Sequence, residues 1–148
     1  MSNQNKNILI IDDDAIFLFT VKEFVNKNFP EIILLEKSSA WDAINFLLNL
    51  GVDNFPNLII SDLDMPDMDG FEFLEAYEKN FLPTHKQIPV VIFSISGNKK
   101  EISKLQAYPS VKEVILKTAI EEKVKYVVSK YVYHLPNKLT DNWILRIP

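Results

Sequence analysis

The chain has 148 residues, 47% hydrophobic and 24% charged, and a formal net charge of −4. These values fit one soluble globular domain without the basic excess of nucleic-acid-binding proteins, and the lack of cysteine excludes disulfides, zinc–thiolate sites and cysteine nucleophiles. No apolar stretch has the length of a signal-peptide core or a membrane span, so we expect a cytoplasmic protein without membrane contact.

Short apolar runs alternate with amphipathic segments through most of the chain. The runs, typical of strands buried on both faces, occupy residues 7–11, 32–35, 57–61, 88–94 and 111–117. The helix-periodic segments occupy 15–28, 38–51, 70–80, 98–108 and 118–130. The alternation predicts an α/β fold: a flavodoxin-like, doubly wound, five-stranded parallel sheet in the order 2-1-3-4-5 with five helices.

Capping residues support the helix boundaries. Ser39 with Asp42, and Thr118 with Glu121, have the spacing of a capping box at the start of a helix. Asp14 stands immediately before the first periodic segment, where an N-cap is expected. The second and fifth helices are therefore predicted to begin just after Ser39 and Thr118.

The last stretch, residues 131–148, falls outside the alternation. It is rather apolar and too short for another domain. We therefore expect one domain over residues 6–130 and a C-terminal tail over 131–148, with no separate output domain. The tail either packs on the body of the domain or presents an adhesive surface.

Aspartates follow two of the predicted strands. Asp12 and Asp13 follow the first strand, and Asp62 and Asp64 follow the third. The carboxyl ends of neighbouring parallel strands meet at one edge of the sheet, so these acids are expected to converge. Clustered carboxylates repel one another unless a cation intervenes, and Mg²⁺ prefers such oxygen ligands.

Two other interpretations of the acidic segment "SDLDMPDMDG" compete with a magnesium site. An EF-hand loop starting at Asp62 would place Asp67 sixth and Phe73 twelfth, where glycine and glutamate are required, so that interpretation fails. A simple turn explains Asp69 and Gly70, but it does not explain Asp62 opposite a second acidic strand end.

The motifs "ILIIDDD", "LIISDLDMPDMDGFEFL", "IPVVIFS" and "VKEVILK" together resemble the receiver domain of two-component response regulators over about residues 6–130. This resemblance implies that Asp62 is the phosphoacceptor. It implies that Asp13 and Asp62 bind Mg²⁺ directly, that Asp12 holds the ion through water, and that Asp64 contributes its backbone carbonyl.

The resemblance also implies further site residues and partners. Ser94 would donate its hydroxyl to a phosphoryl oxygen, and Lys117 would pair with the carboxylate or the phosphate. The phosphoryl group would come from a sensor histidine kinase or a histidine phosphotransfer protein. Output would pass through a homodimer or an effector protein at the face formed by the fourth helix, fifth strand and fifth helix, without nucleic acid or membrane. Such a module is a switch rather than an enzyme.

Three positions depart from the family pattern. Thr118 follows Lys117 where receivers usually have a proline joined by a cis peptide. Ile95 stands where a small residue is usual, and Val114 replaces the aromatic residue that changes rotamer on switching. These departures leave open a pseudo-receiver that binds partners without phosphorylation. A haloacid-dehalogenase-like phosphohydrolase, with Asp62 as nucleophile and Asp64 as general acid, is a second alternative.

Overall fold

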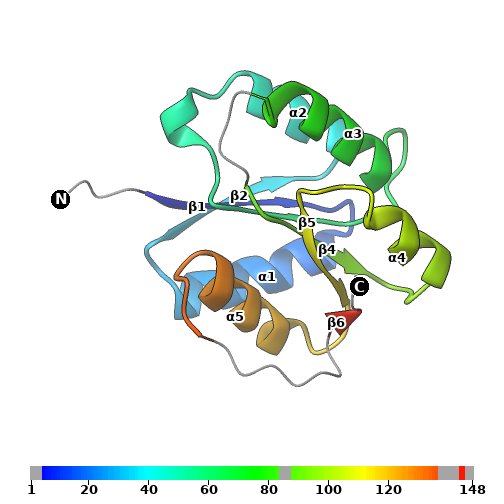
Figure 1. Cartoon of the computed structure of the whole chain (residues 1–148). Coiled ribbons are helices and arrows are strands. Elements are labelled where there is room, and N and C mark those ends of the chain that lie inside the picture. Colours follow the sequence, from blue (N-terminus) through cyan, green and yellow to red (C-terminus); the bar gives the residue numbers. More distant parts are fainter. Residues whose placement is uncertain (1–4, 84–87, 137–143, 146–148) are drawn as a thin grey trace.

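The computed structural model describes residues 5–83, 88–136 and 144–145 (Figure 1). The strands are β1 (Lys6–Ile11), β2 (Ile32–Lys37), β3 (Leu58–Ser61), β4 (Val90–Ser94), β5 (Val111–Leu116) and β6 (Ile144–Leu145). The helices are α1 (Ala15–Asn28), α2 (Ala40–Leu48), α3 (Gly70–Phe81), α4 (Lys99–Leu105) and α5 (Ile120–Tyr131), with a short 3₁₀ helix, η1, at Val52–Asn54.

The strands form one sheet in the order β2-β1-β3-β4-β5-β6. The first five strands are parallel, so the predicted flavodoxin-like order is confirmed. The sequence did not predict β6, which pairs antiparallel with the outer edge of β5. Of the predicted tail, residues 137–143 and 146–148 lie outside the described residues.

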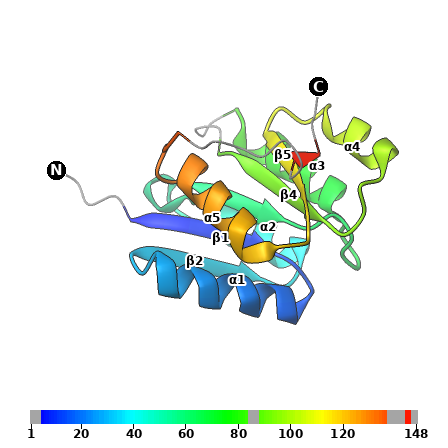
Figure 2. The same ribbon diagram turned by 90° about the horizontal axis from the view of Figure 1, so that it is seen from below.

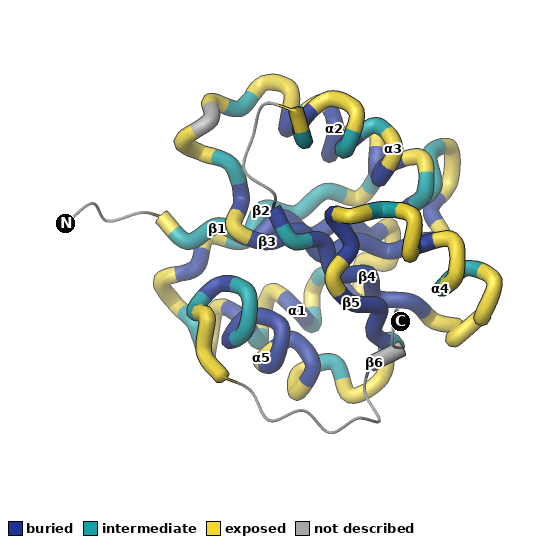
Figure 3. The backbone as a smooth tube through the Cα atoms, viewed as in Figure 1, coloured by how far each residue is buried: buried dark blue, intermediate teal, exposed yellow. Residues whose placement is uncertain are grey.

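Helices cover both faces of the sheet. Helices α2, α3 and α4 lie on one face and helices α1 and α5 on the other, as Figures 1 and 2 show, and their buried side chains pack on the sheet. The central strands are buried on both faces, which explains their unbroken apolar runs (Figure 3). Among the described helices, none combines the length and apolar character needed to cross a membrane.

Side-chain caps fix where most helices begin. The Asp14 carboxylate accepts hydrogen bonds from the first turn of α1, and the Ser39 hydroxyl accepts one from the Asp42 N–H at α2. The predicted cap of the last helix is wrong. Its N-cap is Ala119, in the left-handed conformation (φ 48°), without a side-chain capping bond. The Thr118 hydroxyl has a different partner, Lys123.

Candidate functional site

The pairing of β1 with β3 creates the acidic pocket. Ile11 lies opposite Ser61 in the parallel register, and the next residue of each strand is an aspartate. The Asp62 N–H donates to the Ile11 carbonyl (3.0 Å), and the Asp12 N–H donates to the Lys37 carbonyl (3.1 Å). Backbone hydrogen bonds thus hold both acidic residues at the carboxyl edge of the sheet.

Three carboxylates meet at this edge. Asp12, Asp13 and Asp62 each present an oxygen, and the three oxygens lie within 4.8 Å of one another. Asp12 and Asp62 are buried, whereas Asp13 is exposed and leaves the pocket open to solvent. This donor set, with one solvent-facing member, fits a hard divalent cation that keeps some of its water ligands.

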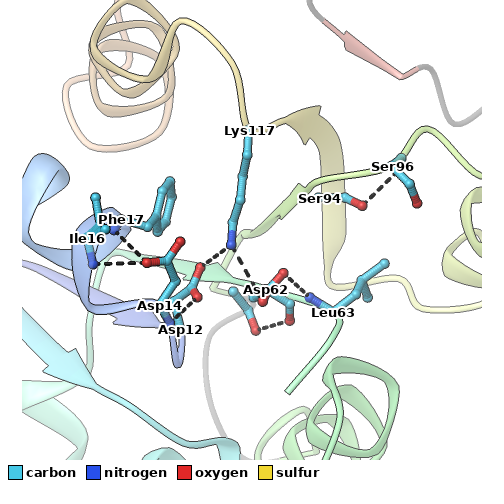
Figure 4. A network of polar contacts seen from close by, with 10 residues as sticks. Asp12, Asp14, Ile16, Phe17, Asp62, Leu63, Ser94, Ser96 and Lys117 are labelled. Carbon is cyan, nitrogen blue, oxygen red and sulfur yellow. Dashed lines mark hydrogen bonds and ion pairs between the residues drawn. The ribbon is translucent and has the colours of Figure 1, made fainter. Parts of the chain in front are cut away.

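Lys117, the residue after β5, places an ammonium between the two buried carboxylates (Figure 4). Its Nζ lies 2.6 Å from Asp12 Oδ2 and 3.5 Å from Asp62 Oδ2. The ammonium also lies over the ring of Phe17 on α1, 4.7 Å from the ring centroid. The aromatic face and the Asp12 carboxylate together hold the lysine inside the pocket.

Burial governs the proton affinity of the acids. The pKa of Asp62 is raised to about 6, chiefly by loss of hydration and then by the Asp12 charge, while Lys117 opposes both effects. Burial also raises the pKa of Asp12, although hydrogen bonds from Lys117 and from the Asp14 N–H lower it. The pocket therefore carries more negative charge than one ammonium can balance, which favours a divalent cation.

Gly70 lets the start of α3 approach the phosphoacceptor position predicted from the sequence. Its N–H donates to the Leu63 carbonyl (2.7 Å). A Cβ at this position would lie 2.5 Å from the Asp62 carbonyl oxygen and 2.7 Å from the Leu63 Cα. The residue assigned above to a simple turn therefore has a steric role beside Asp62, while Asp69 caps α3 through the Glu72 N–H.

The remaining predicted site residues lie around this centre. Ser94 is buried, and its hydroxyl donates to the Ser96 carbonyl (2.8 Å) rather than to a carboxylate. Asp64 is exposed one residue beyond Leu63. Ile95 is 74% exposed, and Val114 is fully buried in the core under α3 and α4. The structure thus joins Asp12, Asp13, Asp62 and Lys117 and keeps the Ser94 hydroxyl apart from them.

The bond after Lys117 is trans, and the lysine still reaches the pocket. The Lys117 N–H donates to the Ser94 carbonyl (2.9 Å), and the Thr118 N–H donates to the Leu116 carbonyl (2.9 Å). This tight turn, followed by the left-handed Ala119, connects β5 to α5 without proline. With threonine at position 118 and a trans bond before it, the Lys117 ammonium still lies against the acids.

Comparison with known proteins identifies relatives of the whole fold. The profile of the response regulator receiver domain matches residues 8–129. Response regulator Rcp1 of Synechocystis sp. is 35% identical over 106 residues, covering 68% of this chain and 69% of Rcp1. The cyclic di-GMP phosphodiesterase response regulator RpfG of Xanthomonas campestris pv. campestris is 29% identical over 93 residues, which cover 63% of this chain but only 23% of RpfG.

Solved structures share the fold. The phosphorylated cyanobacterial phytochrome response regulator RcpA superposes with a TM-score of 0.78 at 24% identity, covering 89% of this chain and 97% of RcpA. The Mn²⁺-bound form of Rcp1 superposes with a TM-score of 0.75 at 25% identity, covering 90% of this chain and 99% of that structure.

Proposed function

This chain belongs to the response regulator receiver family, and we propose that it accepts a phosphoryl group on Asp62 and thereby changes its protein partners. The observation that carries the proposal is the convergence of Asp12, Asp13, Asp62 and Lys117 at one edge of the sheet. Residues 6–130 form the receiver domain in this proposal. A cytoplasmic location and the assignment of residues 131–148 as a tail stay predictions.

We propose that the pocket binds Mg²⁺. Asp13 and Asp62 would be direct ligands, Asp12 would act through water, and the Asp64 carbonyl would complete the protein contribution. The three clustered carboxylates support this assignment, and the Mn²⁺-bound form of the relative Rcp1 agrees with it. The ion would neutralise negative charge on the incoming phosphoryl group.

The proposed reaction is a phosphoryl transfer. A carboxylate oxygen of Asp62 forms a bond to the phosphorus of a phosphohistidine as the phosphorus–nitrogen bond of the donor breaks, and the electron pair returns to the imidazole. The Lys117 ammonium, 3.5 Å from Asp62, is close enough to stabilise the charge on the phosphoryl oxygens. Ser94 would reach a phosphoryl oxygen only after its hydroxyl leaves the Ser96 carbonyl.

The donor would be a sensor histidine kinase or a histidine phosphotransfer protein. Exposed apolar side chains near the pocket support contact with a protein. Ile16, in the first turn of α1, is 78% exposed, and Ile95, just after β4, is 74% exposed. Both follow strand ends at the edge that carries the acids, so a docked protein would bury them beside Asp62.

The output surface in this proposal is the face formed by α4, β5 and α5, used by a second copy or an effector. Val114 is buried on β5 and has no ring to rotate, so the signal would reach this face without an aromatic switch. Glu113, its neighbour, accepts hydrogen bonds from Tyr126 (2.6 Å) and Lys130 (3.1 Å) on α5. In this proposal these contacts would transmit a displacement of β5 to α5.

A direct test is to incubate the protein with Mg²⁺ and acetyl phosphate and to map the modified residue by mass spectrometry. We expect the mass of one phosphoryl group on Asp62, lost when EDTA replaces Mg²⁺ and lost in Asp62→Asn. Asp67→Asn, in the turn before α3, is the matched control and should be phosphorylated normally. Absence of the aspartyl phosphate in the unmodified chain would overturn the proposal and favour the pseudo-receiver.

The same experiment separates the phosphohydrolase alternative. A haloacid-dehalogenase-like enzyme would release phosphate from phosphate monoesters over many turnovers and would need Asp64 as its general acid. Asp64 is exposed, and the receiver profile matches through residue 129. We therefore expect no sustained monoester hydrolysis and at most slow self-dephosphorylation.

A further inference from the structure

Lys123 of α5 is a buried lysine outside the acidic pocket. The residue is only 4% exposed, although lysine is seldom buried without a partner. The Nζ donates one hydrogen bond to the Leu116 carbonyl (3.1 Å) and another to the Thr118 hydroxyl (2.7 Å). The first acceptor belongs to the last residue of β5, and the second lies in the loop that connects β5 to α5.

These two acceptors flank Lys117. Leu116 is the residue before it and Thr118 is the residue after it, and the Thr118 N–H also bonds to the Leu116 carbonyl. One ammonium therefore bonds to the residues on both sides of Lys117, whose own side chain extends to Asp12 (2.6 Å). The conformation of this turn sets where the Lys117 ammonium lies.

The energetics indicate a role other than general stabilisation. Within the described residues, Lys123 makes no ion pair within 4.0 Å, so the loss of hydration is offset by the two neutral acceptors and by the more distant charge of Glu122. Burial lowers the pKa of Lys123, in keeping with this loss. A methionine of similar length would avoid the desolvation penalty, so the ammonium is retained at a cost.

We propose that Lys123 is a positioning residue that holds the Lys117 turn in the geometry needed for phosphoryl transfer. The inference rests on the proposed function, which assigns Lys117 to the phosphoryl oxygens. It adds that this chain, with threonine after Lys117, fixes the turn with a side-chain clamp from α5. Thr118 is the second member of the clamp, because its hydroxyl is the nearer acceptor.

The first experiment measures the rate of phosphorylation by acetyl phosphate at saturating Mg²⁺. We expect Lys123→Met and Thr118→Val to lower the maximal rate roughly 10-fold, as loss of groups that orient a functional side chain does, with unchanged Mg²⁺ affinity. Thr118→Ser, which retains the hydroxyl, should restore the rate. Lys125→Met, at an exposed position of the same helix, is the matched control.

A double-mutant comparison separates positioning from loss of stability. In a Lys117→Met background, Lys123→Met should lower the rate no further, because the side chain that it positions is gone. A further drop equal to that in the unmodified chain would overturn the proposal. Thr118→Val changes an exposed residue, so the comparison can be repeated with this variant if Lys123→Met does not fold.

A second measurement does not depend on phosphorylation. The Lys117 ammonium lies 4.7 Å from the Phe17 ring centroid, so its ε-methylene protons should show a ring-current shift and proton–proton contacts with Phe17 in NMR spectra. We expect Lys123→Met and Thr118→Val to weaken both signals and Lys125→Met to preserve them. Unchanged signals in both clamp variants would overturn the inference. If the two variants weaken the signals but the wild-type chain is not phosphorylated, only the proposed function is overturned.

Discussion

The Lys117 ammonium lies closer to Asp12 than to Asp62, at 2.6 Å and 3.5 Å respectively. One cation therefore faces two buried carboxylates, with the exposed Asp13 beside them. The distances place the lysine chiefly on the acid that we assign to water-mediated metal binding. The proposed phosphoacceptor is left with the longer ion pair and a pKa raised to about 6, and this balance of charges gives the first predictions.

Asp62→Asn should stabilise the protein at neutral pH when divalent cations are absent. The pKa of Asp62 is raised from 3.8 to about 6, so between these values the folded chain holds a proton that the unfolded chain has lost. Stability due to this group is thus present below about pH 4 and lost as the pH rises through about 6. At pH 7 the variant should gain roughly 1–3 kcal/mol, from about 1.4 kcal/mol per pKa unit.

Urea unfolding in EDTA at pH 4 and pH 7 checks this. The two proteins should have similar stabilities at pH 4 and should diverge at pH 7. If the variant is less stable than the unmodified chain at pH 7, burial and the Asp12 charge do not destabilise the ionised Asp62 carboxylate in the folded protein.

Mg²⁺ should raise the unfolding temperature, and Asp13→Asn should remove most of this effect. A ligand that binds only the folded state at 100 times its Kd contributes about 2.7 kcal/mol. Because Asp13 is exposed, its replacement should change the stability of the metal-free protein little. Thermal unfolding across a MgCl₂ titration measures both quantities, with Asp53→Asn, an exposed acid in η1, as the control. Equal Mg²⁺ responses in the two variants would remove Asp13 from the site.

Lys117→Met should destabilise the protein more at pH 7 than at pH 5. Removing one member of a buried ion pair costs about 3 kcal/mol because the remaining charge is unpaired. Lys117 lowers the pKa of both Asp12 and Asp62, so its loss raises both values, and protonation relieves the unpaired charge as the pH falls. Chemical unfolding at the two pH values measures the difference; a deficit independent of pH would indicate lost packing against Phe17 instead.

Gly70→Ala should destabilise the protein by roughly 1–3 kcal/mol, the usual effect of overpacking a tight contact. The added Cβ would meet the backbone of Asp62 and Leu63, at 2.5 Å and 2.7 Å, and backbone cannot move aside as a side chain can. The shift would also displace Asp62, so phosphorylation should slow. Gly51→Ala is the control, since its Cβ would meet only a side-chain atom at 3.8 Å. Equal stabilities of the two variants would contradict the steric argument.

Strand order and the acidic pocket could be predicted from the sequence because both depend on local patterns. The unbroken apolar runs identify strands buried on both faces, and the acids after two of them converge once those strands are neighbours. The predicted N-cap at Ser39 also depends only on neighbouring residues, and the structure confirms it. These features need only the chain order and the rule that parallel strands end at the same edge.

Other features depend on contacts between distant residues. Thr118 has the spacing of a cap, yet its hydroxyl is taken by Lys123, and α5 starts from Ala119 instead. Lys123 did leave a signal, because it lies three residues after Ile120 and one before Val124, on the apolar stripe of α5. The contact of Phe17 with Lys117 left none, since an aromatic residue facing the core is expected in any such helix.

The short strand β6 occupies the outer edge of β5 with backbone hydrogen bonds from the same chain. A foreign strand that adds to this edge must first displace a tethered competitor, whose local concentration does not fall when the protein is diluted. Strand addition here is consequently an exchange rather than a simple association. β6 therefore hinders non-specific pairing of other strands with the edge of β5. Only a partner strand that binds β5 more tightly than β6 does would displace it.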